Sequence, residues 1–107
     1  MTKIINLTPH AVNFVIGENT ITIPASGQLA RVSVQTVPTG EVINGIPVMS
    51  SVYGDVEGLP APQDGVVFLV STLVAGRVTD RNDVFVPNDF VRDDQGRIIG
   101  CRSLGRI

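Results

Sequence analysis

The chain has 107 residues, a net charge of −2 and only 17% charged residues. The length limits the number of domains, and the charge limits the kinds of partner that the protein can bind. The length predicts a single domain, residues 1–107, with one core. The slightly negative net charge provides no field that would attract nucleic acid, so we expect no nucleic-acid partner. A small chain with few charges and 43% hydrophobic residues has apolar surface available for an interface, which predicts a homo-oligomer.

The composition also argues against several kinds of site. The single cysteine, Cys101, excludes an internal disulfide and a zinc site with several cysteines. The single histidine, His10, has no neighbours at metal-ligand spacing, so we expect neither a metal nor a cofactor. The first twelve residues lack the pattern of a signal peptide, and no apolar stretch reaches the roughly eighteen residues that span a membrane. We therefore expect a cytoplasmic protein without membrane contact.

Strand patterns separated by turn residues fill the first third of the chain. Residues 3–7 form a short apolar run, and residues 12–16 and 20–23 alternate between apolar and polar side chains. Residues 17–19 have turn chemistry, so the two alternating segments predict a β-hairpin. Residues 29–37 alternate again and predict a further strand.

The strongest local signal is Asn44-Gly45, which has apolar residues on both sides. Asn-Gly favours a type I′ turn because both central residues of that turn adopt positive φ. Pro47 has no N–H to donate, which places the returning strand at a sheet edge. Residues 53–65 contain three glycines and two prolines, so we expect a loop that connects the two halves of the domain.

The middle of the chain predicts a buried strand followed by a short helix. Residues 66–70 are an unbroken apolar run, which is typical of a central strand buried on both faces. Ser71-Thr72 can cap a helix and Gly76 can end one, so we expect a helix over residues 73–75.

The last quarter returns to strands. Residues 84–87 and 90–92 have the composition of two short strands. Residues 93–96 predict a hairpin turn, with Gly96 in a left-handed conformation, and residues 97–102 predict the return strand. Turn signals every 8–12 residues or so are typical of an all-β sandwich or barrel. We therefore predict a small antiparallel sandwich or barrel with one short helix at an end or on a face.

Arginine dominates the positive charge of the chain, because seven of the eight cationic side chains are arginine. A guanidinium is a rigid, permanently charged fork that binds carboxylates and phosphates bidentately, whereas an ammonium is a loose point charge. The targets of these forks are the chain's own aspartates, a partner subunit or an anionic ligand. Six of the arginines lie in the last thirty-one residues: Arg77, Arg81, Arg92, Arg97, Arg102 and Arg106.

Two polar groups in the chain are candidates for chemistry. In Asp80-Arg81-Asn82-Asp83, Arg81 can bind a phosphate or carboxylate while Asp80 or Asp83 fixes its fork or holds a ligand hydroxyl. The alternative is a loop in which Arg81 braces neighbouring backbone carbonyls. His10 can act as a general base or stack on a ligand, and the alternative is a turn histidine bonded to the backbone.

A glycine-rich segment and the cysteine complete the candidates. Tyr53 can stack on a base, and the nearby Asp55 and Glu57 form a pair of carboxylates able to do acid–base work. The alternative for this segment is a plain connector. Cys101 follows a glycine in a predicted strand, which favours a small core residue over a reactive thiol.

Several motifs, spread over nearly the whole chain, resemble a family of small proteins of bacteriophages and their bacterial hosts that carries no firm activity. In size and in Arg–Asp-rich β character, the chain is also similar to phage sponge proteins, which are small oligomers that sequester nucleotide-derived immune signals. The motifs that resemble the family are Asn6–Val12 (NLTPHAV), Tyr53–Pro60 (YGDVEGLP), Asp80–Asp83 (DRND) and Val91–Cys101 (VRDDQGRIIGC).

Three functions follow from these observations. The first is a non-catalytic anti-defence sponge that binds a small anionic, nucleotide-like ligand between subunits. The second is a phage structural, assembly or host-protein-binding module, and the third is a small hydrolase or lyase with His10 or a carboxylate as base. The sponge is the favoured function, and its expected ligand residues are Arg81, Arg92 and Arg97 for phosphates, Asp80 and Asp83 for ribose hydroxyls, and Tyr53 or His10 for the base.

Overall fold

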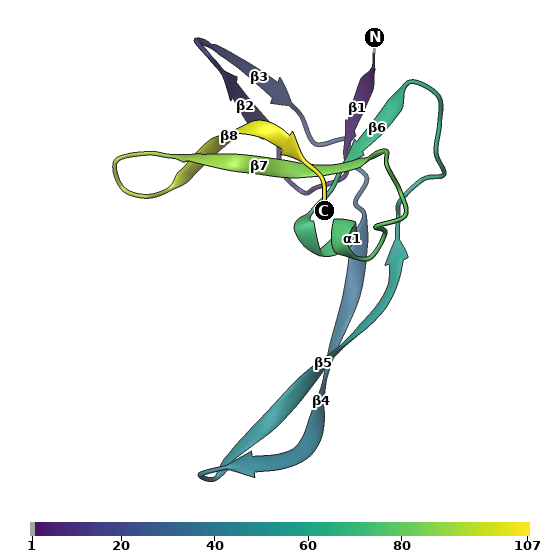
Figure 1. Ribbon diagram of the computed structural model, residues 1–107, viewed down its shortest axis with the longest axis vertical. Helices are drawn as coiled ribbons and strands as arrows, with labels where there is room; N and C mark the ends of the chain where they lie inside the picture. Colours follow the sequence, from purple (N-terminus) through teal and green to yellow (C-terminus); the bar gives the residue numbers. More distant parts are fainter. Residues whose placement is uncertain (1) are drawn as a thin grey trace.

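The computed structural model describes residues 2–107 and shows a curled half-barrel from which one long hairpin projects (Figure 1). The prediction of an all-β fold is confirmed, since the described residues contain one short helix, α1 (Thr72–Gly76). The strands are β1 (Lys3–Asn6), β2 (Val12–Ile16), β3 (Asn19–Ile23), β4 (Arg31–Ile43), β5 (Ile46–Glu57), β6 (Val66–Leu69), β7 (Val84–Arg92) and β8 (Ile98–Gly105).

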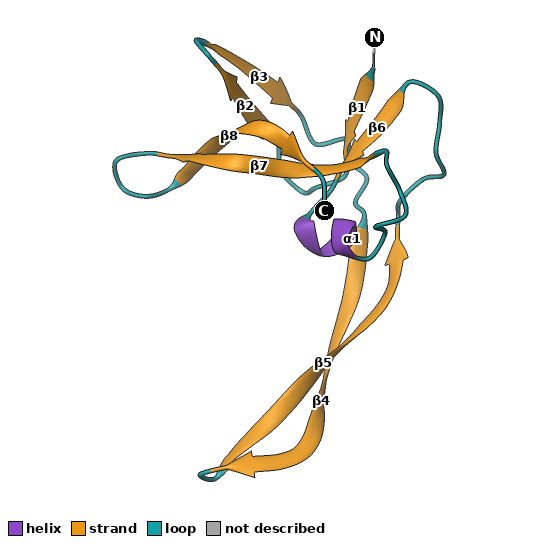
Figure 2. Ribbon diagram, in the orientation of Figure 1, coloured by secondary structure: helices purple, strands orange, loops and turns teal. Residues whose placement is uncertain are grey.

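Six strands form one mixed sheet in the order β1-β6-β7-β8-β2-β3, and β4 and β5 form a separate two-stranded sheet (Figure 2). The pairs β1–β6, β6–β7 and β8–β2 are parallel, whereas β7–β8 and β2–β3 are antiparallel. The sheet is therefore mixed rather than wholly antiparallel. The prediction of an interior strand is confirmed for residues 66–69, because β6 lies between β1 and β7 and its Phe68 and Leu69 are fully buried; Val70, also buried, follows the strand.

The local turn predictions are confirmed. The strands β2 and β3 pair as a hairpin around Gly17, with Phe14 opposite Ile21. Asn44 has a φ of 52° and Gly45 a φ of 78°, as a type I′ turn requires. Gly96 has a φ of 79° in the turn between β7 and β8. These turns depend on residues adjacent in sequence, so local chemistry is enough to specify them.

Two predictions about strand limits are wrong. Residues 53–57 are not a loop, because β5 continues through them and pairs with β4 as far as Glu57. Gly54 lies where a Cβ atom would collide with the side chain of Ser33, so this glycine permits close strand approach rather than a turn. Residues 84–92 are one strand rather than two, since both halves pair with β8 in one register that shifts only between Val91 and Arg92.

The main core lies between β6, β7 and α1. Phe68, Val70, Val74 and Val84 are buried in it, and Val32 of β4 packs against its margin. The helix is capped as the sequence predicts, because the hydroxyl of Ser71 accepts a bond from a backbone N–H of the helix. A second small cluster joins Phe14, Leu69 and Cys101.

Residues 31–57, which we call the arm, form the long β4–β5 hairpin that extends away from the half-barrel (Figure 1). Val32 and Val56 pack against the main core and anchor its base. Along the chain, β4 ends at a turn and β5 returns, so the far end of the arm contains Asn44-Gly45. The arm gives the chain its long dimension, and the principal extents are 54 × 40 × 23 Å.

Among residues 2–107, Asn6 is the one buried polar side chain, and it is 1% exposed. Its Nδ2 donates to the carbonyls of His10 (2.9 Å) and Ile23 (3.0 Å). Its Oδ1 accepts from the N–H (2.9 Å) and the hydroxyl (2.6 Å) of Thr8. All the bonds of this amide are therefore made inside the protein, and they tie the loop after β1 to the end of β3.

Replacing Asn6 by Asp should destabilise the fold by about 3 kcal/mol at neutral pH. The carboxylate would face the carbonyls of His10 and Ile23 where an NH₂ group now donates, and it would be buried without a cation. Chemical denaturation measures the free energy of unfolding. Asn19→Asp, at an exposed position on β3, is the control and should change it by roughly 0.5 kcal/mol or less. Equal effects of the two substitutions would contradict this role for Asn6.

Candidate functional site

The structure does not gather the seven predicted ligand residues into one place. His10 lies in the loop after β1, and Arg92 and Arg97 flank the turn between β7 and β8. The remaining four lie on the arm or in the loop that follows α1: Tyr53, Asp80, Arg81 and Asp83.

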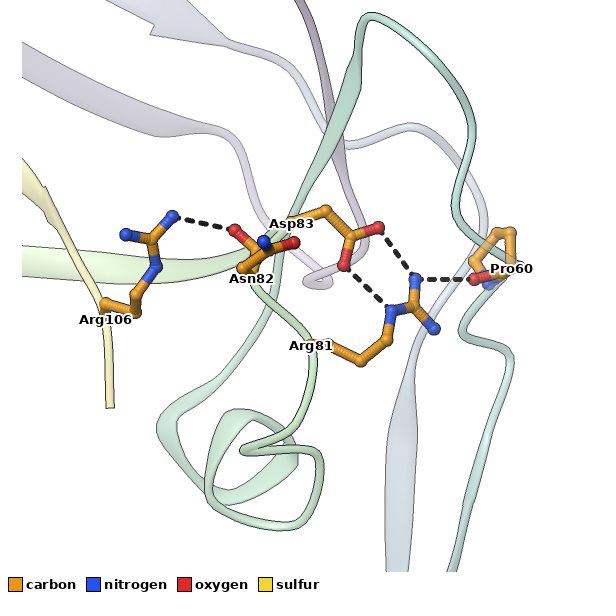
Figure 3. Close-up of polar contacts among 5 residues, drawn as sticks. All are labelled: Pro60, Arg81, Asn82, Asp83 and Arg106. Carbon is orange, nitrogen blue, oxygen red and sulfur yellow. Dashed lines mark hydrogen bonds and ion pairs between the residues drawn. The ribbon is translucent and has the colours of Figure 1, made fainter.

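Arg81 and Asp83 form a bidentate pair within the loop after α1 (Figure 3). Arg81 Nε donates to Asp83 Oδ1 at 2.8 Å, and Nη2 donates to Oδ2 at 2.9 Å. The same Nη2 donates to the carbonyl of Pro60 at 3.0 Å, which joins this loop to the segment after the arm. The side chains are 19% and 14% exposed. The structure therefore uses this guanidinium as a brace between two loops.

The charges of this pair stabilise one another. The hydrogen bond from Arg81 holds the pKa of Asp83 below its ordinary value, against the opposing effect of burial. The hydrogen bond to Asp83 raises the pKa of Arg81, and the negative charges of Asp83 and Asp80 contribute to that rise. Asp80 itself is exposed beside this pair.

The C-terminal residues are attached to the same loop through another arginine (Figure 3). Arg106 Nη2 donates to the carbonyl of Asn82 at 2.7 Å. Its guanidinium carbon also lies 4.7 Å from the ring centre of Phe85, in a cation–π contact. The loop is thus held from both sides, by Pro60 and by Arg106.

Arg92 and Arg97 stabilise the turn that lies between them. Asp93 accepts bonds from the N–H of Gln95 and from both the N–H and Nε of Arg97, each at 2.9 Å. Arg92 Nη1 donates to the carbonyl of Gly96 at 2.8 Å. The backbone bond from Arg97 is the main reason that the pKa of Asp93 is lowered. Both guanidinium groups remain exposed at this hairpin end.

Arg77 contacts Tyr53, and this pair connects the arm to the body of the protein. The guanidinium carbon of Arg77 lies 5.2 Å from the ring centre of Tyr53, and both residues are exposed. Among the described residues, the Arg77 side chain makes no ion pair or hydrogen bond. Sequence reasoning missed Arg77 as a site residue, because its nearness to Tyr53 arises only from the packing of α1 beside β4.

His10 and Cys101 have different surroundings. The backbone carbonyl of His10 accepts bonds from the Asn6 amide and the Thr8 hydroxyl at 2.9 Å, while the residue as a whole is exposed. Cys101 is 1% exposed, and its Sγ lies 3.7 Å from the carbonyl of Asn13. Burial raises the pKa of this thiol, which disfavours the reactive thiolate. The prediction that Cys101 is a core residue is confirmed.

The comparisons with known proteins add no family to these observations. No protein-family model matches the chain, and no similar chain is found among curated proteins or solved structures. Within residues 2–107, no group of three or more histidine, cysteine, aspartate or glutamate side chains is placed to hold a metal ion. In the same part of the chain, the helix is neither long nor apolar enough to cross a membrane.

Replacing Asp83 by Asn should lower the free energy of unfolding at pH 7 by about 1–3 kcal/mol, since the guanidinium of Arg81 loses its charged partner. The folded-state pKa of Asp83 is depressed, so its contribution is fully present above about pH 4 and is lost as the pH falls through the folded pKa. The difference between the two proteins should therefore shrink below about pH 4.

Denaturation in urea at a series of pH values measures this effect. Asp94→Asn, in the exposed turn between β7 and β8, is the matched control and should leave stability within roughly 0.5 kcal/mol of the native protein. A loss in Asp83→Asn that stays constant from pH 7 to about pH 2 would show that its charge does not stabilise the loop.

Proposed function

We propose that the protein is a non-catalytic, homo-oligomeric binding protein that retains a small anionic, nucleotide-like ligand, as phage sponge proteins do. The observation that carries the proposal is the stacking of Arg77 on Tyr53 at a distance of 5.2 Å. An arginine that lacks a carboxylate partner within the described residues and lies on an exposed aromatic ring offers both chemical features of a nucleotide site.

Arg77, Tyr53 and Asp80 would have complementary roles in the proposed site. The planar guanidinium of Arg77 is suited to a phosphate, which it can bind bidentately. The ring of Tyr53 is suited to a flat base, which it can hold by stacking. Asp80 lies three residues after Arg77, is exposed and can accept a hydrogen bond from a ribose hydroxyl.

The bonds that the other arginines already make within the protein support the Arg77–Tyr53 contact as the position of the site. Arg81 and Asp83 already bond to each other and to Pro60. Arg92 and Arg97 bond within their own turn. These three guanidinium groups are already fixed by bonds within the protein, whereas among the described residues the N–H groups of Arg77 make no bond and are all available to a ligand.

The surroundings of Cys101 argue against a cysteine nucleophile. A thiol acts as a nucleophile when it is accessible and its pKa is lowered, and Cys101 is buried with a raised pKa. The hydrolase or lyase alternative would therefore depend on His10 or on a carboxylate as its base.

A structural or assembly role is the second candidate, and the arm favours it. The arm projects from the body and exposes large apolar side chains, including Val42 and Ile46. Proteins use such surfaces for contact with other chains. In that role the arginine pairs would serve only to stabilise the fold and its contacts.

Native mass spectrometry of gently purified protein, repeated after denaturation, tests the proposed function. We expect a discrete oligomer with a nucleotide-sized excess mass, released on denaturation because only non-covalent contacts hold it. Tyr53→Ala and Arg77→Ala should each reduce the bound fraction roughly tenfold, the equivalent of one lost contact of about 1.4 kcal/mol.

Two control variants accompany this experiment. Tyr53→Phe keeps the aromatic ring and should retain the ligand, and Arg97→Ala removes an arginine from the β7–β8 turn and should also retain it. A protein that carries no excess mass would remove the proposed function, and an apo oligomer would favour the assembly role. Equal loss of ligand in Arg97→Ala and Arg77→Ala would contradict the proposed position of the site.

A further inference from the structure

The chain has more surface than a compact protein of its size. Its accessible surface is 7397 Å², whereas a folded monomer of 11.4 kDa is expected to expose about 5,800 Å². Its radius of gyration is 17.1 Å, against about 13 Å for a compact domain of this length. The excess surface is about 1,600 Å², roughly twice the 800 Å² that one partner buries in a standard interface.

The arm accounts for much of this shape, and its composition is that of an interface. Between residues 32 and 54 the only charged residue is Glu41. At the far end, Ile46 is 66% exposed, Val42 is 62% exposed and Ile43 is 55% exposed. Both strands of the arm also have one unpaired edge, because β4 and β5 pair only with each other. An isolated two-stranded hairpin is only marginally stable in water, so this surface needs a partner.

The body of the protein has an apolar groove that matches the arm in character. The groove has a volume of about 240 Å³ and is lined by Val12, Pro87, Phe90, Ile98 and Ile99, among other residues. None of its lining residues is charged. Phe90, Ile98 and Ile99 are each about half exposed, so the chain itself does not fill the groove.

We propose that the arm docks on a second copy of this chain, with its apolar end in the groove formed by β2, β7 and β8 of that copy. The arm and the groove are both apolar and poor in charge, as the centres of protein interfaces are. In a reciprocal exchange, each chain docks its own arm on its partner and receives the partner's arm in its groove. Each chain therefore buries two patches, its arm and its groove. Two patches of standard size account for an excess of about 1,600 Å² per chain.

A second copy fits these observations better than a different protein. The two surfaces match one another and are present on every copy of the chain, so exchange covers both at once. A foreign partner on the arm would leave the groove exposed, and a foreign partner in the groove would leave the arm exposed. This proposal does not depend on the proposed ligand, because it uses only apolar surfaces away from Arg77.

Sedimentation velocity over a range of micromolar concentrations tests the exchange. The native protein should sediment as an oligomer. Ile43 and Ile46 are directly opposite in the arm, so Ile43→Glu combined with Ile46→Lys removes the apolar end while a cross-strand ion pair preserves the hairpin. We expect this double variant to raise the dissociation constant by roughly 100-fold or more.

The matched control is Ile21→Glu, because Ile21 is a half-exposed strand residue outside the arm and the groove. It should leave the dissociation constant unchanged, and circular dichroism should give the same β-sheet spectrum for all three proteins. A monomeric native protein would overturn the proposal, and so would an oligomer that the double variant leaves intact.

Crosslinking tests whether the groove receives the arm. Ile46→Cys protein is mixed with Ile98→Cys protein and treated with a short bis-maleimide. We expect a covalent dimer in the mixture and little in either protein alone, since the native Cys101 is buried in both. A dimer formed by Ile46→Cys alone, with none added by mixing, would mean that arms contact arms and would overturn the groove as the docking site.

Discussion

One small core constrains the whole molecule, because β6, β7, α1 and the base of the arm all meet at the cluster that contains Phe68 and Val70. The strand β6 supplies Phe68, and Val70 follows directly after it. Because β6 pairs in parallel with both neighbours, its position fixes β1 and β7. A single chain of 107 residues buries little apolar side-chain surface beyond this core and its satellite cluster. The arm is anchored at this core only through its base, and most of its length is left uncovered.

Arginine serves mainly to hold short loops to this core. The pair Arg81–Asp83 is largely shielded from solvent, so its charges interact strongly and contribute to stability. The pairs in the β7–β8 hairpin are exposed, and solvent screens them, so they set local geometry more than they stabilise the fold. Five of the six arginines in the last thirty-one residues contact an acid or a backbone carbonyl of the chain itself: Arg81, Arg92, Arg97, Arg102 and Arg106.

The sequence predicted what local chemistry determines. Asn44-Gly45 and Gly96 specify their turns through residues that are adjacent in the chain, and an unbroken apolar run identified β6. The sequence did not predict the parallel pairing of β6, or that residues 53–57 continue β5, because strand partners far apart in sequence decide these features. Gly54 of that segment is equally compatible with a turn, and only the position of Ser33 across the arm shows that it permits close strand approach instead.

The candidate site likewise has one part that the local sequence predicts and one part that it does not. The sequence predicted that Arg81 and Asp83 form a cluster, because they are two residues apart. It also offered the alternative, now observed, that Arg81 braces the loop. The contact between Arg77 and Tyr53 joins residues 24 positions apart and depends on the arm packing beside α1. No local pattern contains that information.

The two proposals meet at this contact, because Tyr53 belongs to the arm and Arg77 to the body. A ligand held between them would restrain the angle at which the arm leaves the half-barrel. Docking of the arm on a second copy would restrain the same angle from the other end. Each event would then lower the entropic cost of the other, so ligand affinity and assembly would rise together by the same factor. A binding protein built in this way would retain its ligand most firmly as the complete oligomer, which is the property that sequestration requires.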